Sequence, residues 1–409
     1  MNIVKKLSLQ DHPWLRASPL VTLLNLLNSD GQNARMVGGC VRDALLGREI
    51  MDIDIACSLA PEDAMTRLEK AGVKVIPTGL KHGTITAVIE KASFEVTTLR
   101  RDVQTDGRHA DVAFTDDWLI DAERRDFTFN ALYLDRDGSL YDPCDGLRDV
   151  AARRVRFIGD PDQRIEEDAL RILRFFRFAA QFGQGELDIK GLEACINNKR
   201  LIENLSGERL AQEFFKILKA ENLLPIIKLM HEKGILAKII PKSENLQNLT
   251  GYVHLEESLG RCNILARLSN LLPKDSDAAD DISRHLKLSS KQAKILKNYT
   301  AHDIGLRADM AQKDIRRSIY LSGRDIFIFA LLQYWARANQ DVNHEGWRKI
   351  LAYAENWPIP TFPVQGKDLM ARGLKSGRAM GEQLRALEQE WVQSDFQLTR
   401  EDMLGKITL

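Results

Sequence analysis

The local pattern of the chain changes near Asp149, and this change limits the folds that it can adopt. Before it, short runs rich in Val, Ile, Thr and Phe alternate with Gly, Asp and Pro, which is typical of strands. These runs cover residues 53–56, 84–89, 94–99, 128–133 and 139–141. After it, apolar residues repeat at helical spacing almost to the end. The sequence therefore predicts an α+β fold, with a small mixed sheet and its helices followed by an all-helical remainder.

Individual helices are predicted in both parts. Leucines at helical spacing (Leu20, Leu23, Leu24 and Leu27) predict a helical lead-in over residues 1–30. A further helix is expected between two strands, over residues 61–70, where Gly72 ends it. Later helical segments are expected at residues 163–182, 207–219, 222–233, 289–299 and 377–393. Three prolines, Pro358, Pro360 and Pro363, indicate a boundary before the last of these segments.

Composition excludes several classes of protein. The chain has 409 residues, 44% hydrophobic and 28% charged, as expected of a globular protein with more than one compact unit. Its five cysteines are widely spaced with no Cys-x-x-Cys pair, which predicts neither a zinc site nor a disulfide framework. Formal net charge is zero, so any nucleic-acid surface must be a local patch. No run approaches the length of a membrane span, and the first ten residues do not resemble a secretory signal. We expect a cytoplasmic protein.

A pair of glycines marks the first candidate site. Gly38 and Gly39 end an apolar run, and Arg42 follows them. Because glycine has no Cβ, backbone amides at such a pair can approach a phosphate closely. A helix that opens there would also direct its positive end toward the phosphate. The segment is therefore a candidate phosphate-binding turn.

Two aspartates follow the glycines. Asp52 and Asp54 are two residues apart in an apolar segment, and strand alternation would place both carboxylates on one face. Such a pair can hold a divalent metal ion for phosphoryl transfer, although the same spacing is common in turns and solvated strands. Glu95 is a lone acid in a run expected to lie beside the first. It is either a third acid of the site or a strand-edge glutamate that faces water.

Charged residues precede the run at 128–133. Arg125 and Asp126 stand directly before it. One interpretation is a surface salt bridge, which would stabilise the protein little. The other is that both residues contact the ribose and phosphates of a nucleotide.

A second charged group lies on the segment predicted to be helical over residues 163–182. Asp168 and Arg171 would be neighbours there, with Arg174 and Arg177 at the next three-residue steps. The simplest interpretation is an ion-paired helix. However, an arginine beside an aspartate can donate to cytosine O2 and N3, or to adenine N1, while the carboxylate accepts from the amine of the base. Uracil and guanine would present an oxygen to the carboxylate and be repelled.

In order along the chain, these motifs resemble the class II CCA-adding tRNA nucleotidyltransferases and their bacterial poly(A) polymerase relatives. The motifs are Gly38-Gly39-x-Val41-Arg42-Asp43-x-Leu45-Leu46-Gly47 with Asp52-x-Asp54, Arg124-Arg125-Asp126-Phe127-Thr128, and Glu167-Asp168-x-x-Arg171 with Arg174. The resemblance implies a nucleotidyltransferase head of the polymerase-β type at residues 31–148. It further implies a helical neck at 149–235, a helical body at 236–355 and a helical tail at 356–409.

The resemblance also implies roles for the candidate residues. Asp52 and Asp54 would bind Mg²⁺, and Glu95 is carried over only as a candidate third catalytic carboxylate. The nucleotide-binding residues would be Gly39 and Arg42 at the phosphates, Arg125 at the nucleotide, Asp126 at the ribose, Asp168 and Arg171 at the base, and Arg174 and Arg177 at the nucleotide or the RNA end. Residues 101–110 are similar to the flexible loop retained by enzymes that add the terminal A, although composition alone fits an ordinary exposed loop equally well.

The implied activity is template-independent addition of C, C and A to the 3′ end of tRNA from CTP and ATP, with release of pyrophosphate. A poly(A) polymerase of the same family is the first alternative, because the head motifs do not separate the two. An inactive RNA-binding protein that keeps the fold is the second, but it predicts loss of the metal ligands, and both aspartates are present. The sequence does not indicate the oligomeric state.

Overall fold

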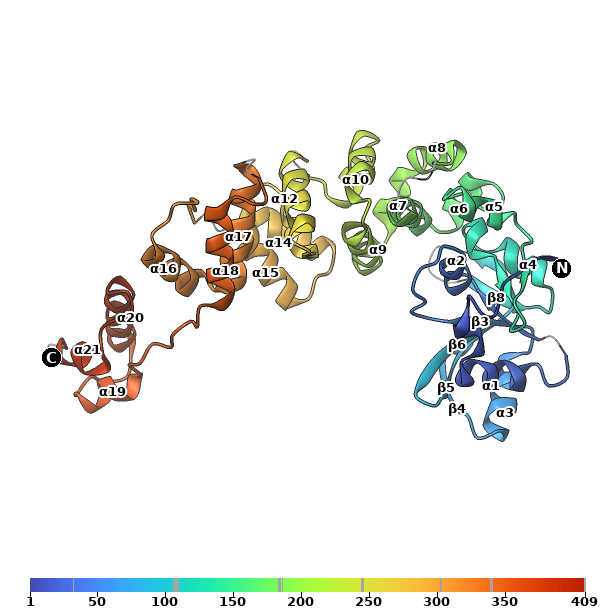
Figure 1. The fold of residues 1–409 in the computed structure, drawn as a ribbon, viewed down its shortest axis with the longest axis horizontal. Coiled ribbons are helices and arrows are strands. Elements are labelled where there is room, and N and C mark those ends of the chain that lie inside the picture. The colour runs from blue at the N-terminus through green and yellow to red at the C-terminus, as the bar shows by residue number, and fades with distance from the viewer. Residues whose placement is uncertain are drawn as a thin grey trace. The chain divides into compact units, whose positions relative to one another are not determined.

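The computed structural model describes residues 1–31, 33–105, 110–182, 185, 187–243, 246–301, 304–338 and 341–407. Its strands belong to the N-terminal part of the chain, coloured blue to cyan in Figure 1, and the rest is helical. The chain divides into two compact units, Met1–Pro241 and Lys242–Leu409. The predicted α+β fold class is confirmed.

One sheet of eight strands organises the first unit. Its spatial order is β1-β10-β9-β2-β3-β6-β5-β4, and only β3 and β6 pair in parallel among these neighbours. The strands are β1 (Ile3–Lys6), β2 (Ala34–Val37), β3 (Asp54–Cys57), β4 (Lys74–Gly79), β5 (Thr84–Ile89), β6 (Ala92–Thr98), β9 (Tyr133–Leu134) and β10 (Ser139–Tyr141). The remaining strands, β7 (Arg100–Thr105) and β8 (Ala110–Phe114), form a separate antiparallel pair. The loop expected at 101–110 falls on this pair, and residues 106–109 lie outside the described residues.

Part of the predicted helical lead-in and the helix predicted over residues 61–70 are helical in the structure. α1 (Ser18–Leu27) packs against α3 (Pro61–Lys70) and β5 and buries the four leucines from which the lead-in was predicted. The other helices before residue 130 are α2 (Gly39–Leu45) and α4 (Trp118–Glu123), with short 3-10 turns at Pro13–Arg16, Leu80–His82 and Thr128–Asn130. β1 was missed within the helical lead-in because all four of its residues are exposed and so show no apolar alternation.

The strand predicted over 128–133 is wrong. Residues 128–130 form a 3-10 turn, and only β9 follows. The Thr128 hydroxyl donates to Asp149 at 2.6 Å, and the Asn130 amide donates to Asp126 at 2.9 Å. Such local side-chain hydrogen bonds compete with a strand ladder, and complete burial of the segment makes its composition resemble a core strand.

Among the helices that follow the sheet, two stand where the sequence predicted one. In chain order, the helices are α5 (Gly146–Ala151), α6 (Pro161–Glu167), α7 (Leu170–Phe182), α8 (Ile189–Asn197), a 3-10 turn at Lys199–Asn204, α9 (Gly207–Lys219), α10 (Leu223–Glu232) and α11 (Leu236–Ile239). The single helix predicted over 163–182 is wrong, because Asp168 is extended at φ −154° and ψ 103° and separates α6 from α7. The Asp168 carboxylate accepts from the Leu170 amide at 3.1 Å, as a capping residue does at the start of a helix.

Aromatic packing joins α7 to the segment before β9. Its rings belong to Phe127, Phe129, Phe157, Phe175, Phe178 and Phe182, all buried. The ring centre of Phe129 lies 4.7 Å from that of Phe182 and 5.0 Å from that of Phe178, and both pairs are edge to face. Large buried rings contribute much of a core's stability. This contact therefore keeps α7 packed at a defined distance from residues 125–130.

The second unit has helices and no strands among its described residues. Its helices are α12 (Gln247–Ser258), α13 (Ile264–Ser269), α14 (Ser276–His285), α15 (Ser290–Ala301), α16 (Gln312–Ser322), α17 (Arg324–Arg337), α18 (Glu345–Asn356), α19 (Gly366–Ala371), α20 (Arg378–Gln393) and α21 (Arg400–Gly405). One apolar cluster surrounds Trp335 and another surrounds Trp391, and residues 357–365 between them contain neither helix nor strand. No helix in the described ranges is long and apolar enough to cross a membrane.

Candidate functional site

The glycine pair forms the turn between β2 and α2. Gly38 has φ +72°, in the left-handed region that favours glycine, and Gly39 is the first residue of α2. A Cβ at Gly38 would lie 3.5 Å from the Asn130 carbonyl oxygen and 3.8 Å from Arg125. The turn therefore brings its backbone close to the segment that carries the predicted Arg125.

Carboxylates gather beside this turn on and next to the central strands β3 and β6. Asp54 begins β3, where it pairs with Val37 on β2 and lies in register with Glu95 on β6. Asp52 precedes the strand and is exposed, so the predicted alternation of both aspartates within one strand is wrong. Desolvation by the surrounding protein raises the pKa of Asp54; the charge of Glu95 raises it further, and Arg125 opposes this. Negative charge is thus concentrated at one point, which favours a bound cation.

The donors fit magnesium in a particular way. Across the described ranges, no group of three or more His, Cys, Asp and Glu side chains is arranged to hold a metal ion. Mg²⁺ usually keeps several waters and takes only one or two carboxylates, with substrate phosphates supplying further oxygens. Asp52 and Asp54 could supply such oxygen ligands, and the site would then suit a metal ion that arrives with a nucleotide rather than one held by protein alone.

Asn130 connects the two predicted phosphate-side arginines. Arg42 donates to its Oδ1 at 3.1 Å while binding Asp43 through two nitrogens at 2.9 Å each. Arg125 donates to the Asn130 carbonyl oxygen at 3.4 Å and to Asp121 at 3.0 Å. Asn130 was missed by the sequence analysis, although it stands only two residues after the motif that carries Arg125.

Asp121 is the anchor of Arg125. Its side chain is only 1% exposed. Burial would raise the pKa of its carboxyl, but Arg125 and Arg124 outweigh burial and hold that pKa at about 2. The pair therefore stays ionised at neutral pH, and Arg125 is held in one orientation beside the glycine turn.

The buried Asp126 and the half-buried Arg174 form a second ion pair. Arg174 donates from Nε to the Asp126 carboxylate at 2.6 Å, while Asn130 Nδ2 and the Phe127 amide donate to the same group at 2.9 Å each. Burial of Asp126 would raise its pKa, but Arg174 and Asn130 lower it. The structure brings together these two predicted residues, which are 48 positions apart in the chain.

Three guanidinium groups surround the ring of Phe178. Arg177 lies 4.1 Å from the ring centre, Arg42 5.1 Å and Arg174 5.6 Å. Arg177 also pairs with the buried Glu213 at 3.0 Å, and burial lowers its pKa to about 10. Cations from α2 and α7 thus converge on one point, which is suited to a phosphate group.

The predicted base-reading residues are close in sequence but do not pair with each other through their side chains. The Asp168 carboxylate accepts from Arg209 on α9 at 2.8 and 3.0 Å. Arg171 donates instead to Glu167 at 2.6 Å and to the Arg164 carbonyl oxygen at 2.7 Å. Asp168 and Arg171 remain one turn apart at the start of α7, where the Arg171 amide donates to the Asp168 carbonyl oxygen at 3.0 Å, but their side chains take other partners. The partner Arg209 was missed because it lies 41 residues later.

A basic hollow of about 600 Å³ continues from this cluster. It opens between α2, α7 and α9. Its cations are Arg42, Arg48, Arg177, Lys216 and Lys219, and its acids are Asp43, Glu49 and Glu221. Arg48, Lys216 and Lys219 were not singled out by the sequence, since each is an ordinary exposed cation until the helices pack.

Carboxylates on central strands of the sheet, beside a glycine turn and clustered arginines, define a nucleotidyltransferase site. The family model described as poly A polymerase head domain matches residues 34–156, and the one described as probable RNA and SrmB-binding site of polymerase A matches residues 186–246. The chain is 34% identical to the mitochondrial CCA tRNA nucleotidyltransferase 1 of Mus musculus over 98% of this chain and 92% of that protein. It is 35% identical to the Homo sapiens protein of the same name, again over 98% and 92%. The chain therefore belongs to the tRNA nucleotidyltransferase/poly(A) polymerase family, and the resemblance to its class II CCA-adding members is confirmed.

Solved structures agree with this assignment. The CCA-adding enzyme of Bacillus stearothermophilus, crystallised in complex with CTP, matches over 95% of each chain with a TM-score of 0.73 and 26% identity. The Thermotoga maritima CCA-adding enzyme, complexed with tRNA, matches with a TM-score of 0.68 over 99% of this chain and 98% of that one. Its identity is 20%, so this likeness concerns the fold alone.

Replacing Arg174 with alanine should destabilise the protein by about 3 kcal/mol, because it leaves the buried Asp126 carboxylate without its cation. The pKa of Asp126 lies below its ordinary value of 3.8, so the pair stabilises the fold fully above that value and progressively less as the pH falls through the lowered pKa. The difference between variant and wild type in urea unfolding should therefore shrink in acid.

The matched control is Arg136→Ala, which removes an exposed arginine and should change stability by less than about 0.5 kcal/mol. Asp126→Asn combined with Arg174→Ala should cost less than the sum of the two single changes. Strict additivity would mean that the two side chains do not stabilise each other.

Proposed function

We propose that this protein adds C, C and A to the 3′ end of tRNA, without a nucleic-acid template, from CTP and ATP and with release of pyrophosphate. The observation that carries the proposal is the register of Asp54, which pairs with Val37 just before the glycine turn and lies beside Glu95. This places acids that can hold a metal ion next to a backbone turn and arginines that can hold phosphates. Family membership over nearly the whole chain supports the same reaction.

The reaction is an in-line attack of the tRNA 3′-hydroxyl on the α-phosphate of the nucleotide. Asp52 and Asp54 would hold Mg²⁺, which when bound lowers the pKa of the attacking hydroxyl and neutralises charge on the phosphates. Gly39 offers a backbone amide without a side chain in the way, and Arg42 offers a cation beside it. Arg125 keeps its place at the nucleotide through Asp121, so its charge is oriented before substrate arrives.

Selection of the base is assigned to Asp168 and Arg171. An arginine donor and a carboxylate acceptor match the edges of cytosine and adenine, whereas uracil and guanine would present an oxygen to the carboxylate. In the structure both groups are engaged, Asp168 with Arg209 and Arg171 with Glu167. To bind a base, Asp168 and Arg171 would either keep these partners while also bonding the base or release them. The base specificity would therefore depend on how Arg209 of α9 holds Asp168.

The remaining arginines are assigned to the phosphates and the RNA end. Arg174 and Arg177 converge with Arg42 around Phe178, and the basic hollow extends from them. Asp126 is proposed as a ribose partner, and its present bonds to Arg174 and Asn130 also give it the task of holding Arg174. The tRNA would extend along the proposed neck (149–235), body (236–355) and tail (356–409).

Neither alternative is favoured. A poly(A) polymerase shares the head, but the relatives that match nearly the whole chain are named for CCA addition. An inactive protein would not be expected to retain both aspartates beside the glycine turn. The compartment is a separate proposal, and we expect the cytoplasm. The names of the mouse and human relatives include the word mitochondrial. Fractionation of cells that express the tagged protein would decide between the two compartments.

Product analysis tests the proposed function directly. A tRNA that ends at its discriminator base is incubated with CTP alone, ATP alone or both. We expect two residues added with CTP alone and three with both nucleotides, because the base-reading pair accepts only C and A. Long A tails on varied RNAs with ATP alone would favour the poly(A) alternative, and no extension by protein that binds both substrates would overturn the proposal.

Changing Asp54 to Asn should lower the rate of nucleotide addition by about 10³-fold or more, since metal stabilisation of transition-state charge amounts to several kcal/mol. Affinity for tRNA should change little, because Asp54 carries negative charge and does not attract phosphates. Asp63→Asn, at an exposed aspartate on α3, is the control and should retain wild-type activity. Loss of tRNA binding in the Asp54 variant would assign that residue a structural role instead.

Changing Glu95 to Gln tests the interpretation of this residue as a third acid of the site, against that of a strand-edge glutamate that faces water. Its charge raises the pKa of Asp54, and only the ionised carboxylate holds a metal ion, so the change should move the acid limb of the activity profile to lower pH. The maximal rate should fall by less than about tenfold if Glu95 acts only through its charge. A loss comparable to that of Asp54→Asn at every pH would make Glu95 a direct metal ligand. Glu62→Gln on α3 serves as the control.

A further inference from the structure

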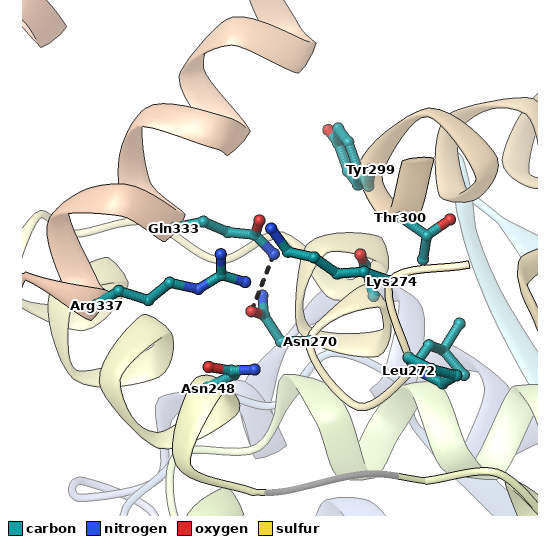
Figure 2. A pocket seen from close by; sticks show the side chains of 10 residues that line it. Asn248, Asn270, Leu272, Lys274, Tyr299, Thr300, Gln333 and Arg337 are labelled. Carbon is teal, nitrogen blue, oxygen red and sulfur yellow. Dashed lines mark hydrogen bonds between the residues drawn. The ribbon is translucent and has the colours of Figure 1, made fainter. Parts of the chain in front are cut away.

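A second polar pocket lies within the helical unit Lys242–Leu409. It holds about 390 Å³ and is walled by α12, α13 and the turn after it, α15 and α17. Figure 2 shows the side chains of Asn248, Asn270, Lys274, Gln333 and Arg337 gathered around it from different elements. None of the residues assigned above to nucleotide transfer lines this pocket. Its volume falls within the range of sites for small ligands.

Buried polar groups form its floor. Asn270 and Gln333 are 5% and 7% exposed, and Gln333 donates from Nε2 to Asn270 Oδ1 at 3.1 Å. Asn270 donates in turn to the Ala266 carbonyl oxygen at 2.9 Å, which fixes the orientation of both amides. Within the described part of the chain, the Gln333 carbonyl oxygen accepts no hydrogen bond. Gln333 therefore has an acceptor and one N–H donor that are not used by the fold.

Ser269 contributes another unused group. Ser269 is only 4% exposed, and its hydroxyl has no hydrogen-bond partner among the described residues. A buried hydroxyl without a partner costs free energy, so such groups in native proteins call for an explanation. A ligand or water in the adjoining pocket would supply the missing partner.

Cations stand at the rim. Lys274 follows α13, and Arg337 is the last residue of α17. In the described ranges, Arg337 forms no ion pair and no side-chain hydrogen bond, and no Asp or Glu lines the pocket. The rim therefore carries positive charge, and that of Arg337 is not neutralised by the described residues. Below the rim, the floor is neutral and can form hydrogen bonds.

We propose that this pocket binds a nucleotide, with its phosphate at Arg337 and Lys274 and its base edge at the amide of Gln333. The guanidinium of Arg337 suits a phosphate because its N–H donors form paired, charge-assisted bonds. An adjacent donor and acceptor on a glutamine match the amine and ring nitrogen of adenine or cytosine. A free nucleotide and a nucleotide unit of an RNA chain offer this same chemistry.

Photolabelling of the full-length protein with 8-azido-AMP tests the proposal. Mass spectrometry of the labelled peptides should place the label in the second unit, near residues 269–274 or 299–300. An excess of AMP should protect these peptides better than adenosine or inorganic phosphate alone, because each of the latter satisfies only one half of the pocket. Label confined to residues 1–241 would overturn the proposal.

Two variants and one control connect the label to the pocket. Arg337→Ala, at an exposed position that should fold normally, is expected to reduce labelling of the second unit about tenfold by removing the charge-assisted bond. Gln333→Leu should also reduce labelling of the second unit, because leucine is similar in size to glutamine but has no amide to bond the base. Lys313→Ala, at an exposed lysine on α16 outside the pocket, should leave labelling unchanged. Labelling that persists at full strength in the Arg337 variant would contradict the assignment.

The source of the nucleotide is decided by competition. If the pocket takes a nucleotide unit of tRNA, excess tRNA should abolish the label, and Arg337→Ala should weaken tRNA affinity. If the pocket takes a free nucleotide, tRNA should leave the label unchanged, and AMP should still protect. Both results support nucleotide binding and differ only in where the nucleotide comes from.

Discussion

Packing of α7 against residues 125–130 is the contact on which the candidate site depends. Phe129 meets Phe178 and Phe182 edge to face, and beside these rings the Asp126 carboxylate holds Arg174. The apolar contact sets the distance between the helix and the turn, while the ion pair sets the rotation of the helix. Because the same turn carries Asn130, which bonds to Arg42, the arginines of α2 and α7 reach one point only when this packing is complete.

The acids and most of the arginines of the site form two groups. Asp52, Asp54 and Glu95 lie at and beside the central strands β3 and β6, where burial and then the charges of Glu95 and Asp52 raise the pKa of Asp54 while Arg125 opposes them. The guanidinium groups of Arg42, Arg174 and Arg177 gather instead around Phe178. Structural acids orient two of these cations, since Asp126 pairs with Arg174 and Glu213 pairs with Arg177. In the function proposed above, a nucleotide with its metal ion would contact the acids and the arginines at once.

Local patterns in the sequence were reliable where one residue type dictates one conformation. The helices at Pro61–Lys70 and Gly207–Lys219 and the strand at Thr84–Ile89 have the predicted bounds. Prediction failed where polar side chains bind nearby backbone or side chains: Thr128 and Asn130 form a 3-10 turn, and Asp168 interrupts a helix. At β1 the four exposed residues carry no burial pattern, so its pairing with β10 could not be read from its own sequence.

The sequence by itself determined the reaction class, because its glycine, aspartate and arginine motifs together, in that order, resemble those of the nucleotidyltransferase family, whereas Asp52 and Asp54 alone would also fit a turn or a solvated strand. It also determined which acids and bases were candidates for the site. Only the tertiary structure decided their partners: Asp168 pairs with Arg209 rather than with Arg171, and Asp126 pairs with Arg174 across 48 positions. These choices depend on how α7 and α9 pack, and side chains that meet through packing leave no regular spacing along the chain.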